Sequence, residues 1–177
     1  CTLNIVERDR SHVESIIVRG NAKTKEYVIS REIPLEAGDV FSKTKLTAGL
    51  RNLYNLQYFS SVVPDVQAGS ESNLLNIVIN VEEQMTNSIE FGLTFSGVTD
   101  PTQIPFALFA KWSNSNVAGT GKTLSASTTI SSAEQSVSFG FTEGWLFGLP
   151  IELNESLSFS HSKANSLRLK YMPDGSV

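Results

Sequence analysis

The sequence predicts an α+β domain of order β-α-α-β-β, followed by antiparallel β-strands that form part of a transmembrane β-barrel. Helical spacing of apolar residues occurs only in the first half of the chain, and strict alternation replaces it from Thr86 onward. Serine plus threonine rises from 12 in residues 1–85 to 25 in residues 86–177, while charged residues become fewer. The later strands thus carry one apolar face and one hydroxyl-rich face, as expected of a barrel wall between lipid and a wet lumen.

Composition narrows the class of protein. The 177 residues carry a net charge of −4 and a pI of about 5.2, so no basic surface for nucleic acid is expected. No run of ~18 apolar residues predicts a transmembrane helix. The single cysteine, Cys1, excludes an internal disulfide; we interpret it as a fragment boundary or strand residue in preference to a lipidated N-terminus.

Three segments are expected. Residues 1–10 resemble the end of a preceding domain, because residues 3–7 and 75–83 both alternate and close on glutamate, which indicates a tandem repeat. Residues 11–85 form the α+β domain. Residues 86–177 form the strands.

The α+β domain begins with a strand at residues 13–18. Thr24 is the expected N-cap of a helix at residues 25–32, since Glu26 follows in the first turn and Pro34 ends the helical pattern.

A second helix follows Ser42, its expected N-cap. The apolar residues Leu46, Leu50 and Leu53 are spaced to form one buried stripe, and Asn55 is expected to take the left-handed position at its end.

A β-hairpin with arms at residues 62–68 and 74–82 completes the domain. Pro64 cannot donate to a central ladder, so the first arm is predicted to be an edge strand. Its exposed edge makes Val62, Val63, Pro64 and Val66 candidates for binding an extended polypeptide.

Six alternating segments follow, each about as long as a tilted membrane-spanning strand. Glu155 interrupts the apolar face of the fifth segment, which indicates either a contact with a protein partner or a break in the register there. The segments are residues 88–95, 106–114, 123–131, 136–141, 151–159 and 167–171. Six strands are fewer than the ~8 of the smallest closed transmembrane barrel, so only part of a barrel is expected.

Residues 11–83 carry motifs similar to a POTRA domain, the last one before the barrel of BamA-type outer-membrane assembly factors. Two later motifs resemble the first two periplasmic turns of that barrel. The motifs are Gly20-Asn21-x-x-Thr24, Ile29-x-Arg31, Gly38-Asp39-x-Phe41, Leu46, Gly49-Leu50-x-x-Leu53, Tyr58-Phe59, Val81-Glu82-Glu83, Asn114-x-x-x-Ala118-Gly119-Thr120-Gly121 and residues 142–150.

The resemblance implies a POTRA domain in the periplasm of a bacterium and a barrel in its outer membrane. Residues 114–122 and 143–150 would be periplasmic turns. Residues 97–105, 132–135 and 161–165 would be extracellular. The turn residues singled out are Asn114, Gly119, Gly121, Trp145 and Pro150.

The resemblance also implies assembly and insertion of outer-membrane proteins. The POTRA domain would receive unfolded barrel clients, and the first barrel strand would act as a lateral gate that pairs with an incoming client strand. Accessory periplasmic lipoproteins and outer-membrane lipid would be the other partners. The gate residues are Ile89, Phe91, Gly92, Leu93 and Phe95.

No chemistry is indicated. His12 and His161, the only histidines, have no nucleophile or metal-ligand pattern beside them, and Gly119-x-Gly121-Lys122 lacks the spacing of a phosphate loop. We expect no catalytic residue, no metal site and no cofactor, and the chain is not expected to be an enzyme.

Two other functions fit the same pattern. A two-partner secretion or organelle transport barrel also joins POTRA domains to strands. A soluble α+β domain fused to a β-sandwich would bind a partner without entering a membrane.

Overall fold

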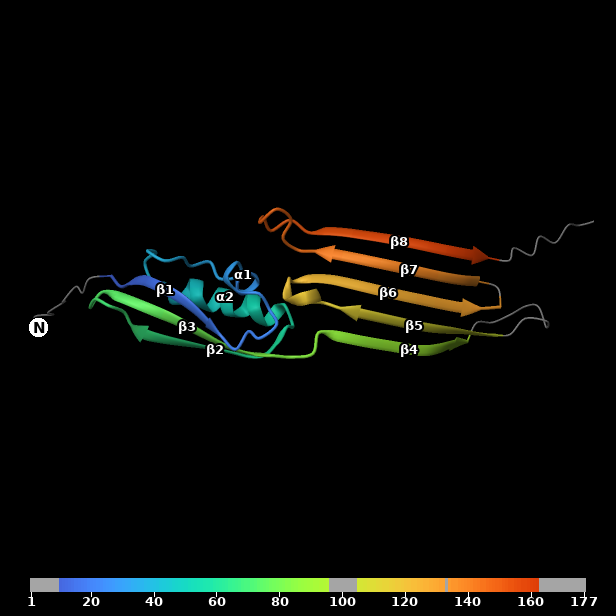
Figure 1. The fold of residues 1–177 in the computed structure, drawn as a ribbon, viewed down its shortest axis with the longest axis horizontal. Coiled ribbons are helices and arrows are strands. Elements are labelled where there is room, and N and C mark those ends of the chain that lie inside the picture. The colour runs from blue at the N-terminus through green and yellow to red at the C-terminus, as the bar shows by residue number, and fades with distance from the viewer. Residues whose placement is uncertain (1–9, 96–104, 133, 163–177) are drawn as a thin grey trace, which may run out of the picture.

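A computed structural model of the chain describes residues 10–95, 105–132 and 134–162, which form two sheets lying end to end (Figure 1). The first sheet has the order β1-β3-β2, with β1 parallel and β2 antiparallel to β3. Helices α1 and α2 lie between β1 and β2 in the chain, which confirms the predicted β-α-α-β-β order. The bounds are β1 His12–Arg19, α1 Glu26–Ser30, α2 Lys43–Asn55, β2 Phe59–Ala68 and β3 Leu74–Glu83.

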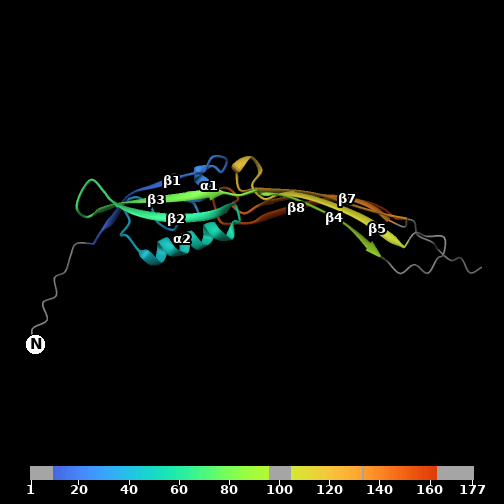
Figure 2. The ribbon, with the colours of Figure 1, turned by 90° about the horizontal axis from the view of Figure 1, so that it is seen from below.

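The core of this first domain lies between its sheet and its helices, and Figure 2 shows α2 running along one face of the sheet. The predicted stripe of α2 faces inward: Leu46 and Leu53 are buried and Leu50 packs against them. Ser42 caps α2 as expected, accepting a hydrogen bond from the Lys45 N–H. The alternate β3 residues Ile77, Ile79 and Val81 bury the facing side.

The second sheet contains five antiparallel strands in chain order, β4-β5-β6-β7-β8. Directly opposite residues share a face, so the register sorts the side chains. One cross-strand row reads Phe91, Ala110, Thr128, Val137, Phe159, and the next polar row reads Glu90, Lys111, Ser127, Ser138, Ser158. The strands are β4 Asn87–Phe95, β5 Phe106–Asn114, β6 Lys122–Ser131, β7 Glu134–Glu143 and β8 Leu153–Ser162, with the 3-10 turn η1 Val117–Gly119 between β5 and β6.

The apolar face of this second sheet is exposed, whereas the hydrophobic core of the described residues belongs to the first domain. Ile89, Phe91 and Phe95 on β4 are 73%, 82% and 79% exposed. Soluble proteins rarely expose a contiguous apolar patch of this kind to water, so this face requires an apolar surrounding.

The structure corrects three helix predictions. Helix α1 is shorter than residues 25–32, and its N-cap is Lys25, without a side-chain cap. Thr24 is not the cap, because its hydroxyl instead accepts a hydrogen bond from the Asn116 side chain. The left-handed residue after α2 is Gln57, with φ 59°, and not Asn55, which lies inside the helix.

Strand ends also differ. β8 begins at Leu153 and not at residue 151, because Ile151 exchanges backbone hydrogen bonds with Leu146 and Leu149 in the preceding turn. β7 begins at Glu134, and His161 lies in β8, so the expected loops at 132–135 and 161–165 are shorter at those ends. The expectations for Cys1, residues 1–9, 97–104, 163–165 and the sixth strand at 167–171 lie outside the described residues.

Truncation of Leu53, which is 0% exposed, tests the core assignment. We expect Leu53→Ala to lower the free energy of unfolding of residues 10–86 by about 2–5 kcal/mol, since the cavity is enclosed by both helices and the sheet. Thr47→Ala, at an exposed position of the same helix, should stay within about 0.5 kcal/mol. Urea denaturation measures both, and equal effects would contradict the core assignment.

Candidate functional site: a free strand edge and two docked turns

β4 lies at the edge of the second sheet and pairs only with β5 among the described residues. The predicted gate residues Ile89, Phe91, Leu93 and Phe95 all project from its apolar face and are more than half exposed. In an antiparallel ladder, alternate residues direct their N–H and C=O groups to opposite sides. One set of β4 backbone groups is therefore available to another strand.

Gly92 lies on the opposite, hydroxyl-rich face, directly across from Phe109. A Cβ placed on Gly92 would lie 2.6 Å from the nearest Phe109 ring carbon. The absent side chain thus makes room for the ring. Gly92, one of the predicted gate residues, is therefore packed against Phe109, and its role in the gate stays a prediction.

The second predicted edge is also present, since β2 has β3 on one side and no other strand among the described residues. Val62 points into the core, while Val63 and Val66 are 54% and 42% exposed. Pro64 pairs with Ile79 in the register and lies within the edge strand, as predicted.

The turn between β5 and β6 contacts the first domain through its backbone. The Gly119 carbonyl accepts the Lys25 N–H at 2.8 Å, and the Gly121 carbonyl accepts the Tyr58 hydroxyl at 3.4 Å. The close approach requires glycine: a Cβ on Gly119 would lie 1.9 Å from the Lys23 carbonyl oxygen.

Two asparagines shape this turn from within. Asn114 accepts hydrogen bonds from the Thr86 hydroxyl and the Asn116 N–H. The Asn116 side chain accepts the Gly121 N–H at 2.8 Å and donates to the Thr24 hydroxyl at 2.9 Å. Asn116 is buried, so one side chain both closes the turn and fastens it to the first domain.

The turn between β7 and β8 contacts the residues that directly follow α1. The Trp145 indole N–H donates to the Glu32 carboxylate at 2.9 Å. The Arg31 guanidinium lies 5.2 Å from the Trp145 ring centroid and 5.7 Å from that of Tyr27, and its Nε is 3.7 Å from Glu32. Pro150, the other predicted residue of this turn, is exposed.

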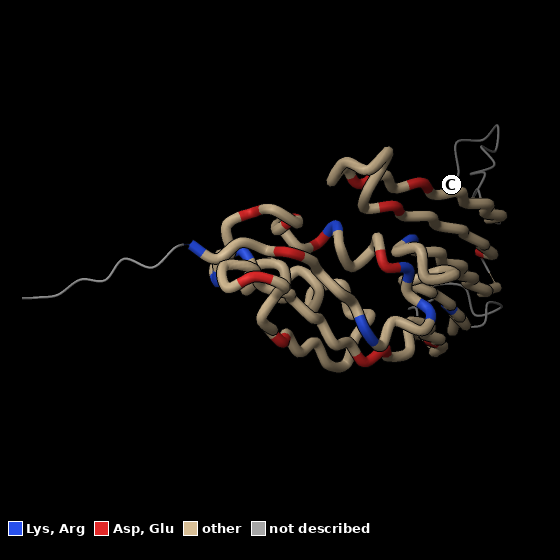
Figure 3. The backbone as a smooth tube through the Cα atoms, turned by 60° about the vertical axis from the view of Figure 1, so that its left-hand side comes forward, with Lys and Arg blue, Asp and Glu red and all other residues tan. Residues whose placement is uncertain are grey.

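The charged groups follow this arrangement. Figure 3 shows charged positions on the first domain and around the turns, whereas the strands beyond are mostly uncharged. Glu83, the last residue of β3, accepts hydrogen bonds from the backbone N–H groups of Lys23 and Thr24. Burial raises the pKa of Glu83, but these hydrogen bonds outweigh it, so the pKa lies below its ordinary value of 4.5.

Tyr58 lies between the domain core and the first turn. Burial, its largest influence, raises the pKa of the Tyr58 hydroxyl above its ordinary value of 10.0, against the opposing charge of Arg31. The hydroxyl therefore remains protonated and able to donate to Gly121.

Within residues 10–95, 105–132 and 134–162, no three His, Cys, Asp or Glu side chains are grouped to hold a metal ion. No helix in those ranges is both long and apolar enough to cross a membrane.

The sequence did not predict most of the contacts between the first domain and the two turns. Arg31 entered only as part of a motif, and Thr24 was assigned to a helix cap, but both contact the turns. These partners lie 92 to 114 residues apart in the chain, so no local pattern marks them. The glycines of the first turn were the available signal, because closely spaced glycines indicate a close backbone approach.

A family model described as POTRA, surface antigen variable number repeat, matches residues 11–84. The chain is 48% identical over 159 residues to a Treponema pallidum (strain Nichols) protein whose name describes an outer membrane protein assembly factor, covering 90% of this chain and 19% of that protein. It is 28% identical over 163 residues to outer membrane protein assembly factor BamA of Buchnera aphidicola, covering 92% and 26%. The chain thus spans about a fifth to a quarter of these relatives.

Solved structures share the fold. BamA from Haemophilus ducreyi, lacking POTRA domains 1–3, matches with a TM-score of 0.77 at 18% identity, over 88% of this chain and 28% of that chain. CdiB from Escherichia coli matches with a TM-score of 0.59 at 15% identity, over 85% and 28%. The first domain and the antiparallel strands therefore form one fold that is also present in these solved structures.

Gly119 and Gly148 offer a matched test of turn docking, since both have positive φ, +74° and +77°. Alanine at either position pays about 1–2 kcal/mol for that conformation. The added Cβ collides with the first domain only in Gly119→Ala, because no atom lies within 4 Å of a Cβ placed on Gly148. We expect Gly119→Ala alone to broaden the distance distribution between spin labels on α2 and β6. Identical distributions for the two variants would exclude a role for the close contact.

Acid should weaken the hydrogen bonds between the Glu83 carboxylate and the backbone N–H groups of Lys23 and Thr24. Its pKa in the folded protein is lowered, so its stabilising contribution is complete above the unfolded value near 4.5 and is lost as pH falls through the lower folded pKa. We expect the thermal stability of the wild type to fall over this pH range more steeply than that of Glu83→Gln. Parallel pH profiles for the two proteins would contradict the assignment.

Proposed function

Since residues 11–84 are a POTRA domain and the chain is related to BamA-type outer-membrane protein assembly factors, we propose that β4 templates the insertion of client barrels into the outer membrane. The POTRA domain lies on the periplasmic side of the outer membrane and the strands lie within it. In this proposal the domain receives unfolded clients, and the β4 edge pairs with the incoming strand.

The free edge of β4 is the observation that carries the proposal. Unpaired N–H and C=O groups are costly in lipid, where no water is present to bind them. A client strand that pairs with β4 removes this cost and is itself ordered by the same hydrogen bonds. The apolar side chains of β4 already face the surroundings that the client must enter.

The docked turns support a defined approach path. Hydrogen bonds and the Arg31–Trp145 contact hold the POTRA domain against the periplasmic ends of β5 to β8. A client held at the β2 edge, near exposed Val63 and Val66, would remain close to the barrel. Accessory periplasmic lipoproteins are the other partners proposed for that edge.

Transport of a polypeptide through the barrel is the second candidate. The fold shared with CdiB favours it. The relative at 48% identity is named for assembly, so we place assembly first. A soluble β-sandwich is disfavoured, because a sandwich would bury the apolar face of the second sheet, which is exposed here. The names of the relatives describe assembly and no chemical reaction, in agreement with a protein that is not an enzyme.

Proline substitution tests the templating edge. Proline removes one backbone donor, so we expect Phe91→Pro or Leu93→Pro in the full-length protein to reduce insertion of client barrels about tenfold or more, with smaller effects on its own membrane level. Phe91→Ala keeps the amide and serves as the control, with near-normal insertion. Insertion into liposomes, scored by resistance of clients to urea extraction, measures the effect. Normal insertion by both proline variants would remove the templating role.

A further inference from the structure

Glu155 places a carboxylate on the apolar face of the second sheet. The register pairs Glu155 with Phe141, and its same-face neighbours along β8 are Leu153 and Leu157. Among the described residues, Glu155 has no hydrogen bond and no ion pair. The register around Glu155 is continuous, so the regular alternation of β8 places its side chain on this face and no local irregularity is involved.

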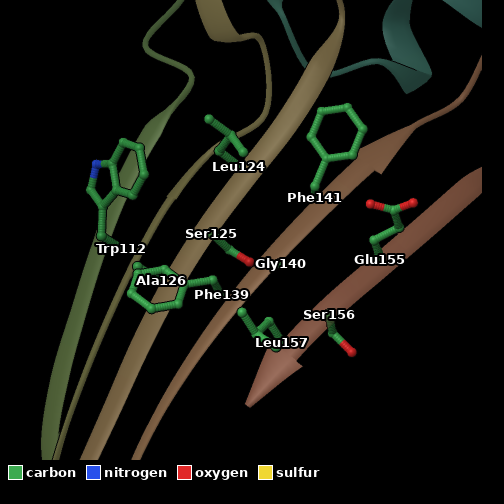
Figure 4. Close-up of a pocket in the computed structure, with 10 residues that line it drawn as sticks. All are labelled: Trp112, Leu124, Ser125, Ala126, Phe139, Gly140, Phe141, Glu155, Ser156 and Leu157. Carbon is green, nitrogen blue, oxygen red and sulfur yellow. The ribbon is translucent and has the colours of Figure 1, made fainter. Parts of the chain in front are cut away.

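A hollow of about 640 Å³ opens beside this carboxylate. Figure 4 shows Glu155 at one end of it. The hollow exists because Ala126, a small residue, occupies the middle of the face between larger neighbours. Its other apolar lining is Trp112, Leu124, Phe139, Phe141 and Leu157.

A second hollow continues the first. The two share Trp112 and Ala126, and the second is lined further by the apolar residues Ile89, Ala110 and Val137 and by Lys111, Ser127 and Thr128. Three successive cross-strand rows of this face line the groove. The first contains Glu155, the second contains Trp112 and Ala126, and the third contains Ala110 and Val137. The groove therefore leads from a charged end near the turns into the apolar middle of the sheet.

The level of Glu155 matches that of a lipid headgroup. Trp112 lies one row further from the turns, and tryptophan is enriched at the membrane–water interface. The nearest charged groups, Lys122 and Glu143, pair with each other at 3.2 Å. Lys122 Nζ also lies 5.9 Å from the centroid of the Phe141 ring beside Glu155, but its ion pair is with Glu143. Within the part of the chain that the structure describes, Glu155 thus has no ion-pair partner at the mouth of the groove, and its complement is a cation.

We propose that this groove binds one phospholipid of the periplasm-facing leaflet, with an acyl chain along Ala126 and Ala110 and a primary ammonium headgroup at Glu155. The inference rests on the proposed membrane location of the strands. Charge complementarity selects the headgroup: an ammonium neutralises the carboxylate, whereas the anionic headgroup of phosphatidylglycerol is repelled by it. The small side chains of Ala126 and Ala110 leave room for the acyl chain, which a face made only of large side chains would not.

Lipid retention by the full-length protein tests the proposal. Protein is released from nanodiscs of phosphatidylethanolamine and phosphatidylglycerol with matched acyl chains, and retained lipids are counted by native mass spectrometry. A partly exposed charge pair contributes up to ~1 kcal/mol, so we expect roughly a two- to fivefold preference for phosphatidylethanolamine in the wild type. Glu155→Gln should abolish the preference, and Ala126→Leu should lower retention of both lipids.

Glu90→Gln is the matched control, because Glu90 lies on the opposite, hydroxyl-rich face; it should keep the wild-type preference. Equal retention of both lipids by the wild type, or an unchanged preference in Glu155→Gln, overturns the inference. A photocrosslinker at residue 155 that captures a polypeptide and no lipid also overturns it. Client insertion is measured on the same preparations. Equal retention of both lipids by a wild type that inserts clients normally sinks only this inference, whereas strands recovered without detergent would sink the proposed function as well.

Discussion

The structure depends on one constraint: backbone hydrogen-bonding groups placed in lipid need partners. All five strands meet it on at least one side, and β5, β6 and β7 meet it on both. Within the described residues, β4 and β8 meet it on one side only. Of these two edge strands, β4 has the more exposed apolar side chains, with Phe91 at 82% against 61% for Phe159 on β8. An edge of this kind is stable only when something else pairs with it.

The POTRA domain is joined to this sheet by more than the short connection of residues 84–86. Two turns that are separate in the chain converge on the segment that contains α1: Asn116 binds Thr24, which precedes the helix, and Trp145 binds Glu32, which follows it. Backbone groups of the turn at Gly119 complete the contact. Because α1 has only five residues and no side-chain cap, part of its N-terminal hydrogen bonding comes from the barrel turn. The domain and the strands are therefore mutually dependent at this point.

Each face of the second sheet carries one residue that breaks the alternation of apolar and hydroxyl-bearing side chains. Phe109 is an aromatic residue on the hydroxyl-rich face, and the missing side chain of Gly92 explains it. Glu155 is a carboxylate on the apolar face, and no group among the described residues compensates it. The first departure is resolved by packing within the sheet, whereas the second points outward, toward a ligand.

The sequence by itself determined the elements, since periodicity is local: a stripe at Leu46, Leu50 and Leu53 forms only on a helix, and alternation from residue 88 forms only on strands. It also determined that β2 is an edge strand, because Pro64 cannot donate. Only the tertiary structure decided what Thr24, Arg31 and Gly119 contact, because these contacts join residues about 90 or more positions apart. It likewise decided that Thr24 is not a helix cap, because the Thr24 hydroxyl binds the Asn116 side chain instead. The sequence around Thr24 does not indicate this distant partner.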